Sequence, residues 1–269
     1  MTTDVLTRNH VNISGRGQRP MLFAHGFGCD QNMWRFVAPA FEDDHRLVLF
    51  DYVGSGRSDL REYNEGRYRS LDGYADDVLD ICRALNLRDV VFVGHSVSAV
   101  IGILSAIREP DRFAHLILIC PSPRYVNDPP DYVGGFDRED IEGLLGMMDK
   151  NYIGWANYLA PAIMKNPDRP ELSAELEQSF CSTDPRAARQ FARVTFLSDN
   201  RKDLAAVQTP SLILQCSEDA VAPQEVGDYV YHHLKGSTLR VMQATGHCPH
   251  MSHPEETVQL IREYLGISR

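Results

Sequence analysis

The fold is decided by the stretch Val91-Phe-Val-Gly-His-Ser-Val-Ser-Ala-Val100. It begins as an apolar run typical of a buried strand and turns sharply at Gly94-His-Ser-Val-Ser98 into a segment of helical character. A serine on such a turn projects its hydroxyl above the sheet, next to the positive end of the helix. We therefore predict that Ser96 is a nucleophile. The pattern G-x-S-x-G ends here in Ser98 instead of glycine, and serine is small enough for helix and strand to approach closely.

Other short apolar runs lie on both sides of this turn. They cover Met21 to Ala24, Leu47 to Phe50, Val90 to Val93, Leu116 to Cys120 and Leu212 to Leu214. Apolar residues spaced by about three and four, from Leu71 to Leu85, predict a helix ahead of the run at Val90. Strands that alternate with helices indicate a mostly parallel central sheet flanked by helices, so we predict an α/β fold.

The alternation stops in residues 122–204, where no strand-like run occurs. One apolar face there extends from Ile141 to Ile163, and a second amphipathic stretch lies near Arg186 to Leu197. We predict that this segment is a helical lid inserted into a single α/β core, which comprises residues 1–121 and 205–269.

A loop before the nucleophile is suited to stabilise negative charge. Attack by a neutral serine creates an oxyanion that preorganised donors must meet, usually the amide after the nucleophile and one from the turn after an earlier strand. The stretch Met21-Leu-Phe-Ala-His-Gly-Phe-Gly28 supplies an apolar strand followed by such a turn. We predict that the amides of Phe27 and Val97 are the oxyanion donors, and a glycine turn without a catalytic part is the alternative.

Ten histidines compete for the role of the base that activates a serine. His247 follows the strand-like run Leu239 to Met242, in a loop from which it could reach across the top of the sheet. His250 and His253 are the nearby alternatives. His95 adjoins the nucleophile with its side chain turned away from it, so we predict that His95 belongs to the pocket wall.

The acid that orients this histidine should also follow a strand. The stretch Leu212-Ile-Leu-Gln-Cys-Ser-Glu-Asp219 ends in two acids, of which we predict Asp219, with Glu218 as the alternative. The chain order Ser96, Asp219, His247 is the order found in α/β-hydrolase triads.

Aromatic residues in the lid segment are candidates for an apolar pocket over Ser96. Together with Phe27 and His95, the predicted lining residues are Phe136, Trp155, Tyr158 and Phe196. The alternative for each of the lid aromatics is packing between lid helices.

Charge and composition exclude several classes of partner. With 27 basic and 37 acidic residues the formal net charge is −10, and no Lys/Arg cluster reverses it locally, so nucleic acid and anionic membrane are poor partners. No apolar run approaches the roughly 20 residues of a membrane span. The Gly54-Ser-Gly56 sequence lacks the third glycine of a dinucleotide loop, and we expect no cofactor.

Cysteine usage and the N-terminus predict a cytoplasmic protein. The six cysteines show no CxxC spacing, which indicates buried free thiols and neither disulfides nor a metal site. Residues 1–10 lack the charged start and apolar stretch of a secretory signal.

Motifs along nearly the whole chain closely resemble one hydrolase family. They are Phe23-Ala-His-Gly-Phe-Gly-Cys-Asp30, Phe50-Asp-Tyr-Val-Gly-Ser-Gly56, Gly94-His-Ser-Val97, Asn127-Asp-Pro-Pro130, Gly134-Gly-Phe136, Asn151-Tyr-Ile-Gly-Trp155, Phe180-Cys-Ser-Thr-Asp-Pro185 and Gly246-His-Cys-Pro-His-Met-Ser-His-Pro254. They resemble the bacterial RsbQ-like hydrolases, which act with the phosphatase RsbP in activating the general stress sigma factor, and the plant strigolactone and karrikin receptors. The resemblance implies a small hydrolase of the α/β-hydrolase fold with a four-helix lid, an apolar pocket and a signalling role tied to a small ligand.

The residues and the resemblance together leave three functions open. The first is an RsbQ-like serine hydrolase that takes a small apolar ester or lactone and is coupled to stress signalling through an RsbP-like phosphatase. The second is a ligand sensor of the strigolactone or karrikin receptor kind, in which hydrolysis is slow. The third is a metabolic esterase or carbon–carbon bond hydrolase without a partner. Ser98 is similar to the plant receptors whereas Asp51 to Gly56 is similar to the bacterial members, so the motifs do not choose among them.

Overall fold

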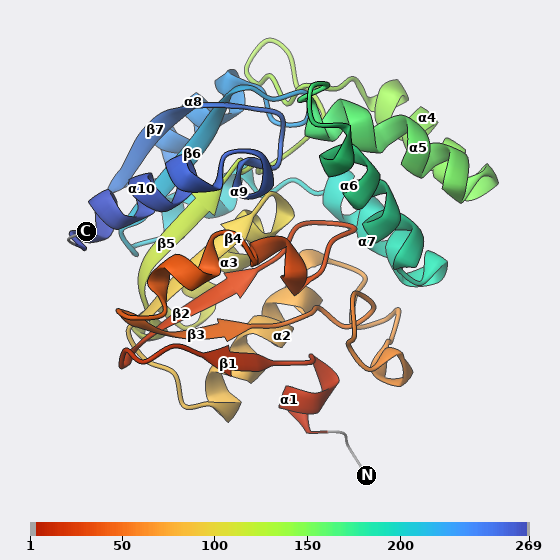
Figure 1. Ribbon diagram of the computed structural model, residues 1–269. Helices are drawn as coiled ribbons and strands as arrows, with labels where there is room; N and C mark the ends of the chain where they lie inside the picture. The colour runs from red at the N-terminus through yellow and green to blue at the C-terminus, as the bar shows by residue number, and fades with distance from the viewer. Residues whose placement is uncertain (1–3, 268–269) are drawn as a thin grey trace.

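A computed structural model describes residues 4–267, so the first three and last two residues of the predicted core lie outside it. Within this range seven strands form one sheet in the order β1-β3-β2-β4-β5-β6-β7 (Figure 1). Neighbouring strands pair in parallel except β1, which is antiparallel to β3. The strands are β1 Asn12–Ser14, β2 Arg19–Ala24, β3 His45–Leu49, β4 Val90–His95, β5 Phe113–Ile119, β6 Ser211–Glu218 and β7 Ser237–Thr245.

Helices cover both faces of this sheet, and the predicted α/β fold is confirmed. The α-helices are α1 Val5–Arg8, α2 Leu71–Ala84, α3 Val97–Arg108, α4 Arg138–Lys150, α5 Tyr152–Met164, α6 Pro170–Ser182, α7 Pro185–Phe196, α8 Gln224–His233, α9 Pro249–Ser252 and α10 Pro254–Leu265. Short 3₁₀ turns are η1 Gln31–Trp34, η2 Ala38–Phe41, η3 Leu60–Glu62, η4 Pro110–Arg112 and η5 Arg201–Ala206.

Strand β4 shows why the central runs are apolar throughout. Val90 and Phe92 join the core that contains residues of α2 and α3, whereas Val91 and Val93 join the core that contains Ile261 of α10. Alternate residues of a strand point to opposite faces, so a strand covered on both sides needs apolar residues at every position. The exposed edge strand β1 has no such run, which is why the apolar pattern did not reveal it.

Helices α4 to α7 lie between β5 and β6 in the chain and sit together at one side of the molecule (Figure 1). We refer to these four helices as the lid. The apolar face from Ile141 to Ile163 belongs to two helices, because Asn151 ends α4 and its side-chain oxygen accepts a hydrogen bond from the Gly154 amide at 3.0 Å, at the start of α5. Helix α6 was not predicted from the pattern, although its buried residues Leu172, Leu176 and Phe180 are spaced by four.

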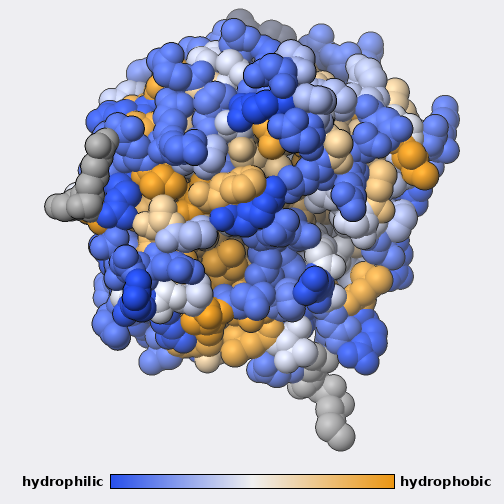
Figure 2. Space-filling view, in the orientation of Figure 1, coloured by the Kyte–Doolittle hydropathy of each residue, from blue (hydrophilic) through white to orange (hydrophobic). Residues whose placement is uncertain are grey.

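The face of the molecule in Figure 2 is mainly hydrophilic, with hydrophobic residues gathered in smaller patches. Acidic residues outnumber basic ones in the sequence. Among residues 4–267, no helix has both the length and the apolar character that crossing a membrane requires.

Candidate active site

Ser96 occupies the turn between β4 and α3 with φ 58° and ψ −123°, a conformation that side-chain-bearing residues rarely adopt. The Ser96 amide donates to the carbonyl of Ile119 at 2.8 Å, which ties the turn to β5. A Cβ on Gly94 would lie 2.6 Å from the carbonyl oxygen of Ser98, so glycine is needed where strand and helix meet. The local sequence therefore holds the Ser96 hydroxyl at the carboxyl end of the sheet.

His247 and Asp219 reach Ser96 from the ends of two other strands. Nε2 of His247 lies 2.7 Å from Oγ of Ser96, and Nδ1 of His247 lies 2.6 Å from Oδ2 of Asp219. A carboxylate only accepts hydrogen bonds, so Nδ1–H donates to Asp219 and the Nε2 lone pair faces the serine proton. This arrangement can take the proton from Ser96 as its oxygen attacks a carbonyl carbon.

The electrostatics keep Asp219 ionised. Burial acts to raise the pKa of Asp219, but the neighbouring His247 charge and the hydrogen bonds to the carboxylate outweigh it, so the pKa lies below the ordinary value. Two of those bonds come from the amides of Val221 and Ala222, at 2.8 and 3.0 Å. For His247, burial acts to lower the pKa, whereas Asp219 raises it, and the net pKa is above the ordinary value.

The alternative acid and bases lie elsewhere. Glu218 is exposed and pairs with Lys165. His250 is buried against the rings of Trp34 and His95, and burial lowers its pKa to about 3. Nδ1 of His253 bonds to its neighbour Ser252 at 2.9 Å. Asp219 and His247 are thus the pair that the fold brings to Ser96.

His95 forms a hydrogen bond with the backbone of His247. Its Nε2 lies 2.6 Å from the carbonyl oxygen of His247, and it must donate because a carbonyl only accepts. The ring also lines the cavity at Ser96, as predicted for a wall residue. His95 therefore fixes the loop that carries His247.

The amide N–H groups of Phe27 and Val97 donate to no acceptor within residues 4–267, so both are free to donate to a ligand oxygen. Ser98 connects the two halves of this candidate oxyanion site, since its hydroxyl donates to the carbonyl of His25 in the Phe27 loop. The hydroxyl of Tyr52 donates in turn to Ser98 Oγ at 2.9 Å. The departure from glycine at position 98 thus has a structural use.

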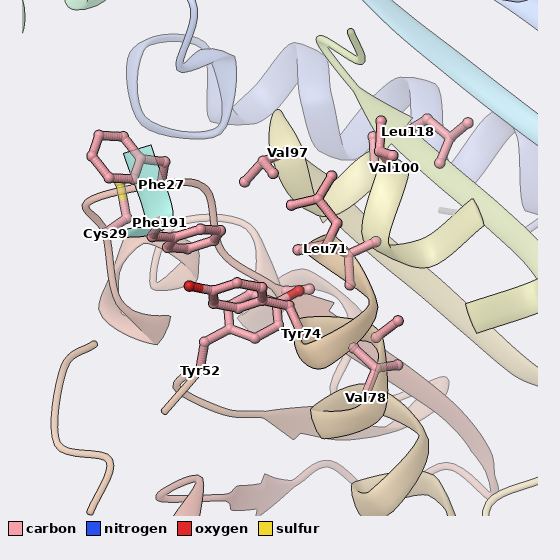
Figure 3. Close-up of a cluster of buried hydrophobic side chains, with 14 of the residues drawn as sticks. Phe27, Cys29, Tyr52, Leu71, Tyr74, Val78, Val97, Val100, Leu118 and Phe191 are labelled. Atoms are coloured by element: carbon pink, nitrogen blue, oxygen red, sulfur yellow. The ribbon is translucent and has the colours of Figure 1, made fainter. Parts of the chain in front are cut away.

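Packing beneath this loop is aromatic. Figure 3 shows the loop that carries Phe27 above the ring of Phe191, with Tyr74 and Tyr52 farther down. The ring centroids of Phe27 and Phe191 lie 5.7 Å apart, and Phe191 stacks on Tyr74 at 4.1 Å. A lid helix, α7, therefore packs against the Phe27 loop of the core.

Ser96 opens onto a cavity of about 30 Å³, which we call the inner cavity. That is room for roughly one or two water molecules. Phe27, His95 and Phe196 line it as predicted, and Tyr125, Ile163, Phe180 and other residues complete the wall.

Residues 19–254 match the family model described as alpha/beta hydrolase fold. The chain belongs to this family. It is 36% identical to the strigolactone esterase D14 of Arabidopsis thaliana, over 97% of this chain and 98% of that protein. It is 34% identical to the karrikin insensitive 2 receptor CA of Petunia hybrida, over 96% and 95% of the two chains. A solved hydrolase structure from Oleispira antarctica is 49% identical with a TM-score of 0.96, covering 98% of this chain and 97% of that one. The predicted similarity to the strigolactone and karrikin receptor hydrolases is confirmed.

Three lid residues predicted to line the pocket of this hydrolase lie outside the inner cavity. Phe136 and Tyr158 line a separate cavity of about 480 Å³ beside α4 and α5, which we call the outer cavity, and Tyr158 is 64% exposed. Trp155 is buried behind the wall, packing against Phe27 and Phe180 with centroids 6.0 and 5.1 Å away. The inward stripe of α5 passes through Trp155, Leu159 and Ile163, and only its last residue reaches the inner cavity.

Sequence reasoning missed most of the remaining wall of the inner cavity, including Tyr125 and Phe180. Tyr125 places its hydroxyl 3.4 Å from Oγ of Ser96. It follows β5 at the same end of the sheet as the triad, and a polar residue soon after a parallel strand was a usable signal. Phe180 comes from the unpredicted helix α6.

The prediction of buried cysteines is wrong for Cys181, which is exposed on α6. The other five are buried, and Sγ of Cys120 lies 3.5 Å from Sγ of Cys216. Cys120 also comes close to Asp219 and His247, with ligand-type atoms of the three within 4.8 Å of one another. Asp219 and His247 already use their side-chain atoms in the hydrogen bonds of the triad.

We expect Asp219→Asn to lower kcat/KM by about 10⁴-fold, the scale observed when a triad acid is replaced by its amide. Since Asp219 raises the pKa of His247, and His247 must be neutral to act as a base, activity rises with pH through that pKa. The acidic limb of the pH–kcat/KM profile should therefore move to lower pH in the variant. Glu218→Gln is the matched control and should leave both quantities near the parent; the reverse ranking would make Glu218 the acid.

We expect Ser98→Ala to lower the free energy of unfolding by about 1–3 kcal/mol, because the buried Tyr52 hydroxyl and His25 carbonyl lose their partner. Ester kcat/KM should also fall, since the Phe27 loop is no longer held to α3. Ser105→Ala is the control, as it removes a buried hydroxyl of the same helix whose sole partner among residues 4–267 is the carbonyl of Ile101. Urea unfolding and ester kinetics measure both effects, and parental kcat/KM in Ser98→Ala would show that Ser98 does not position the loop.

Proposed function

We propose that this hydrolase cleaves small neutral esters or lactones by acyl transfer through Ser96, and that the ligand serves as a signal. The observation that carries the proposal is the hydrogen-bonded chain from Ser96 through His247 to Asp219, which opens onto the inner cavity. The similarity to strigolactone esterases and karrikin receptors supports the same substrate class and the signalling role.

In the proposed mechanism, Oγ of Ser96 bonds to the carbonyl carbon while its proton passes to Nε2 of His247. The carbonyl electron pair moves onto oxygen, which the amides of Phe27 and Val97 receive. The carbon–oxygen bond to the leaving group then breaks, and the leaving oxygen takes the proton from His247. Water attacks the acyl-serine with the same assistance from His247, and Ser96 is restored.

The inner cavity favours a neutral ligand. Much of its wall is apolar, with Phe27, Phe180 and Phe196 among the rings. A charged substituent would lose its hydration there without gaining a partner, which is costly. Small esters and lactones meet this constraint, and charged metabolites do not.

The small volume of the inner cavity connects binding with lid movement. Space for one or two waters does not admit a lactone ring unless lining residues move, and these include Ile163 of α5, Phe180 of α6 and Phe196 of α7. The carbonyl of Ile163 also accepts the His247 amide at 2.8 Å, so the end of α5 is tied to the catalytic base. A ligand that binds better to a displaced lid shifts the population toward that state, as a sensor requires.

A second candidate adds a phosphatase partner of the RsbP kind, supported by the RsbQ-like motif Asp51-Tyr-Val-Gly-Ser-Gly56. In this version the ligand-bound lid presents the surface that the phosphatase recognises. A cytoplasmic site of action, expected from the cysteine pattern, belongs to the same proposal. This candidate requires that the protein activate such a phosphatase when the ligand is bound and not when it is absent.

The test compares the parent and Ser96→Ala on a butenolide lactone, a short-chain ester and a long-chain ester. We expect slow hydrolysis of the butenolide and little of the long-chain ester by the parent. Ser96→Ala should lose hydrolysis while still binding the butenolide in a thermal-shift assay, because only one small polar atom is removed. Rapid turnover of charged or long-chain esters without butenolide binding would indicate a metabolic esterase, and residual activity within about tenfold of the parent would exclude Ser96 as the nucleophile.

A further inference from the structure

Tyr125 is a polar side chain of the inner cavity for which the acyl-transfer steps above provide no role. It lies between β5 and α4, is 1% exposed, and places its hydroxyl oxygen 3.4 Å from Oγ of Ser96. Those steps use Ser96, His247 and two backbone amides. A buried hydroxyl beside the reacting atoms therefore needs an explanation.

The Tyr125 ring is held in a fixed place. The Tyr125 carbonyl accepts the amide of Phe136 at 3.2 Å, and the ring packs edge-on against Phe196 with centroids 5.2 Å apart. Gly134 is pressed against the same carbonyl, since a Cβ there would lie 2.5 Å from the oxygen. Fixed donors are worth most in an active site, because they need no reorganisation during the reaction.

Tyr125 must be the donor in its contact with Ser96. The single hydroxyl proton of Ser96 faces Nε2 of His247, so Oγ can only accept from the phenol. Burial raises the pKa of Tyr125, which keeps the phenol protonated at neutral pH. The 3.4 Å separation exceeds the usual hydroxyl–hydroxyl distance of about 2.7–2.8 Å. Within residues 4–267 the Tyr125 hydroxyl has no other partner, so it can serve a closer acceptor in the cavity.

The strand order puts Tyr125 across Ser96 from the oxyanion donor of the Phe27 loop. Strand β4, which leads to Ser96, lies between β2, which leads to Phe27, and β5, which leads to Tyr125. A carbonyl oxygen that points to the amides of Phe27 and Val97 leaves the other substituents of the carbon on the side of Tyr125 and His247. One of these substituents is the leaving oxygen.

We infer that Tyr125 donates a hydrogen bond to the leaving oxygen and thereby suits this hydrolase to enol esters and enol lactones. The inference rests on the proposed acyl transfer through Ser96. As the tetrahedral intermediate collapses, the carbon–oxygen bond breaks and its electron pair moves onto the leaving oxygen. His247 gives that oxygen the proton taken from Ser96, whereas Tyr125 keeps its own proton and only donates a hydrogen bond. Cleavage of the bond to an enol oxygen runs ahead of this proton transfer, so negative charge builds on that oxygen in the transition state, and a fixed neutral donor stabilises it.

The test measures kcat/KM, which reports acylation, for three acetates that differ only in the leaving group: 4-nitrophenyl, phenyl and vinyl acetate. In Tyr125→Phe we expect roughly a tenfold or greater loss on phenyl and vinyl acetate, the scale of a lost hydrogen bond to a charged group. With 4-nitrophenyl acetate, whose leaving group is already stable, the loss should stay below about threefold. The dependence of rate on leaving-group basicity thus becomes steeper in the variant.

Tyr132→Phe is the matched control. It removes the same atom from another buried tyrosine of the same segment, whose hydroxyl donates to the carbonyl of Arg124. This variant should change all three esters by one common factor. An equal loss on all three esters in Tyr125→Phe would overturn the inference, and so would a fall in kcat with kcat/KM unchanged, which would indicate a role in deacylation. Failure of the parent to hydrolyse any of the esters is a separate outcome, because it would remove the acyl-transfer proposal itself.

Discussion

The backbone conformation of Ser96 is the constraint on which the site depends. A non-glycine residue at φ 58° costs on the order of 1–3 kcal/mol, and the surroundings must hold it in place. They do so through the two-sided burial of β4 and the hydrogen bond from the Ser96 amide to Ile119. Contacts from this turn reach the base, the Phe27 loop and β5.

Three residues of the turn each reach a different part of the site. His95 donates to the carbonyl of His247, Ser96 faces the base and the inner cavity, and Ser98 donates to the carbonyl of His25. The turn therefore fixes the loop that carries His247 and the loop that carries Phe27 relative to the serine that lies between them. A change in the orientation of α3 relative to β4 would disturb all three contacts together.

The wall of the inner cavity is coupled to the triad in a similar way. Ile163 and Val221 line both the inner and the outer cavity, so they form the partition between them. The carbonyl of Ile163 accepts the His247 amide, and the amide of Val221 donates to Asp219. A ligand that displaces Ile163 and Val221 as it enters would also shift the hydrogen bonds from these residues to His247 and Asp219. The position of the lid would in this way affect the reactivity of the triad.

The sequence alone could predict every strand of the sheet except β1, together with the three triad residues, because each of these residues follows an apolar run that marks a buried strand. Parallel strands bring their carboxyl ends to one edge, so residues far apart in the chain meet there. The pocket could not be predicted as well. Which face of a lid helix turns inward depends on contacts with the other helices, and Tyr158 and Phe136 show how an aromatic in that segment can line a different cavity. The hydrogen bonds made by His95, Ser98 and Tyr125 join segments that follow different strands. The spacing of residues along the sequence does not reveal such contacts.

Intact-protein mass spectrometry after exposure to a butenolide lactone tests the central claim most directly, because it observes the covalent step itself. The account predicts a mass increase equal to the acyl fragment, located by peptide mapping on Ser96 or passed to His247, and no increase in Ser96→Ala. Hydrolysis of the butenolide by the parent with no adduct at any time point, or the same adduct on Ser96→Ala, would contradict it.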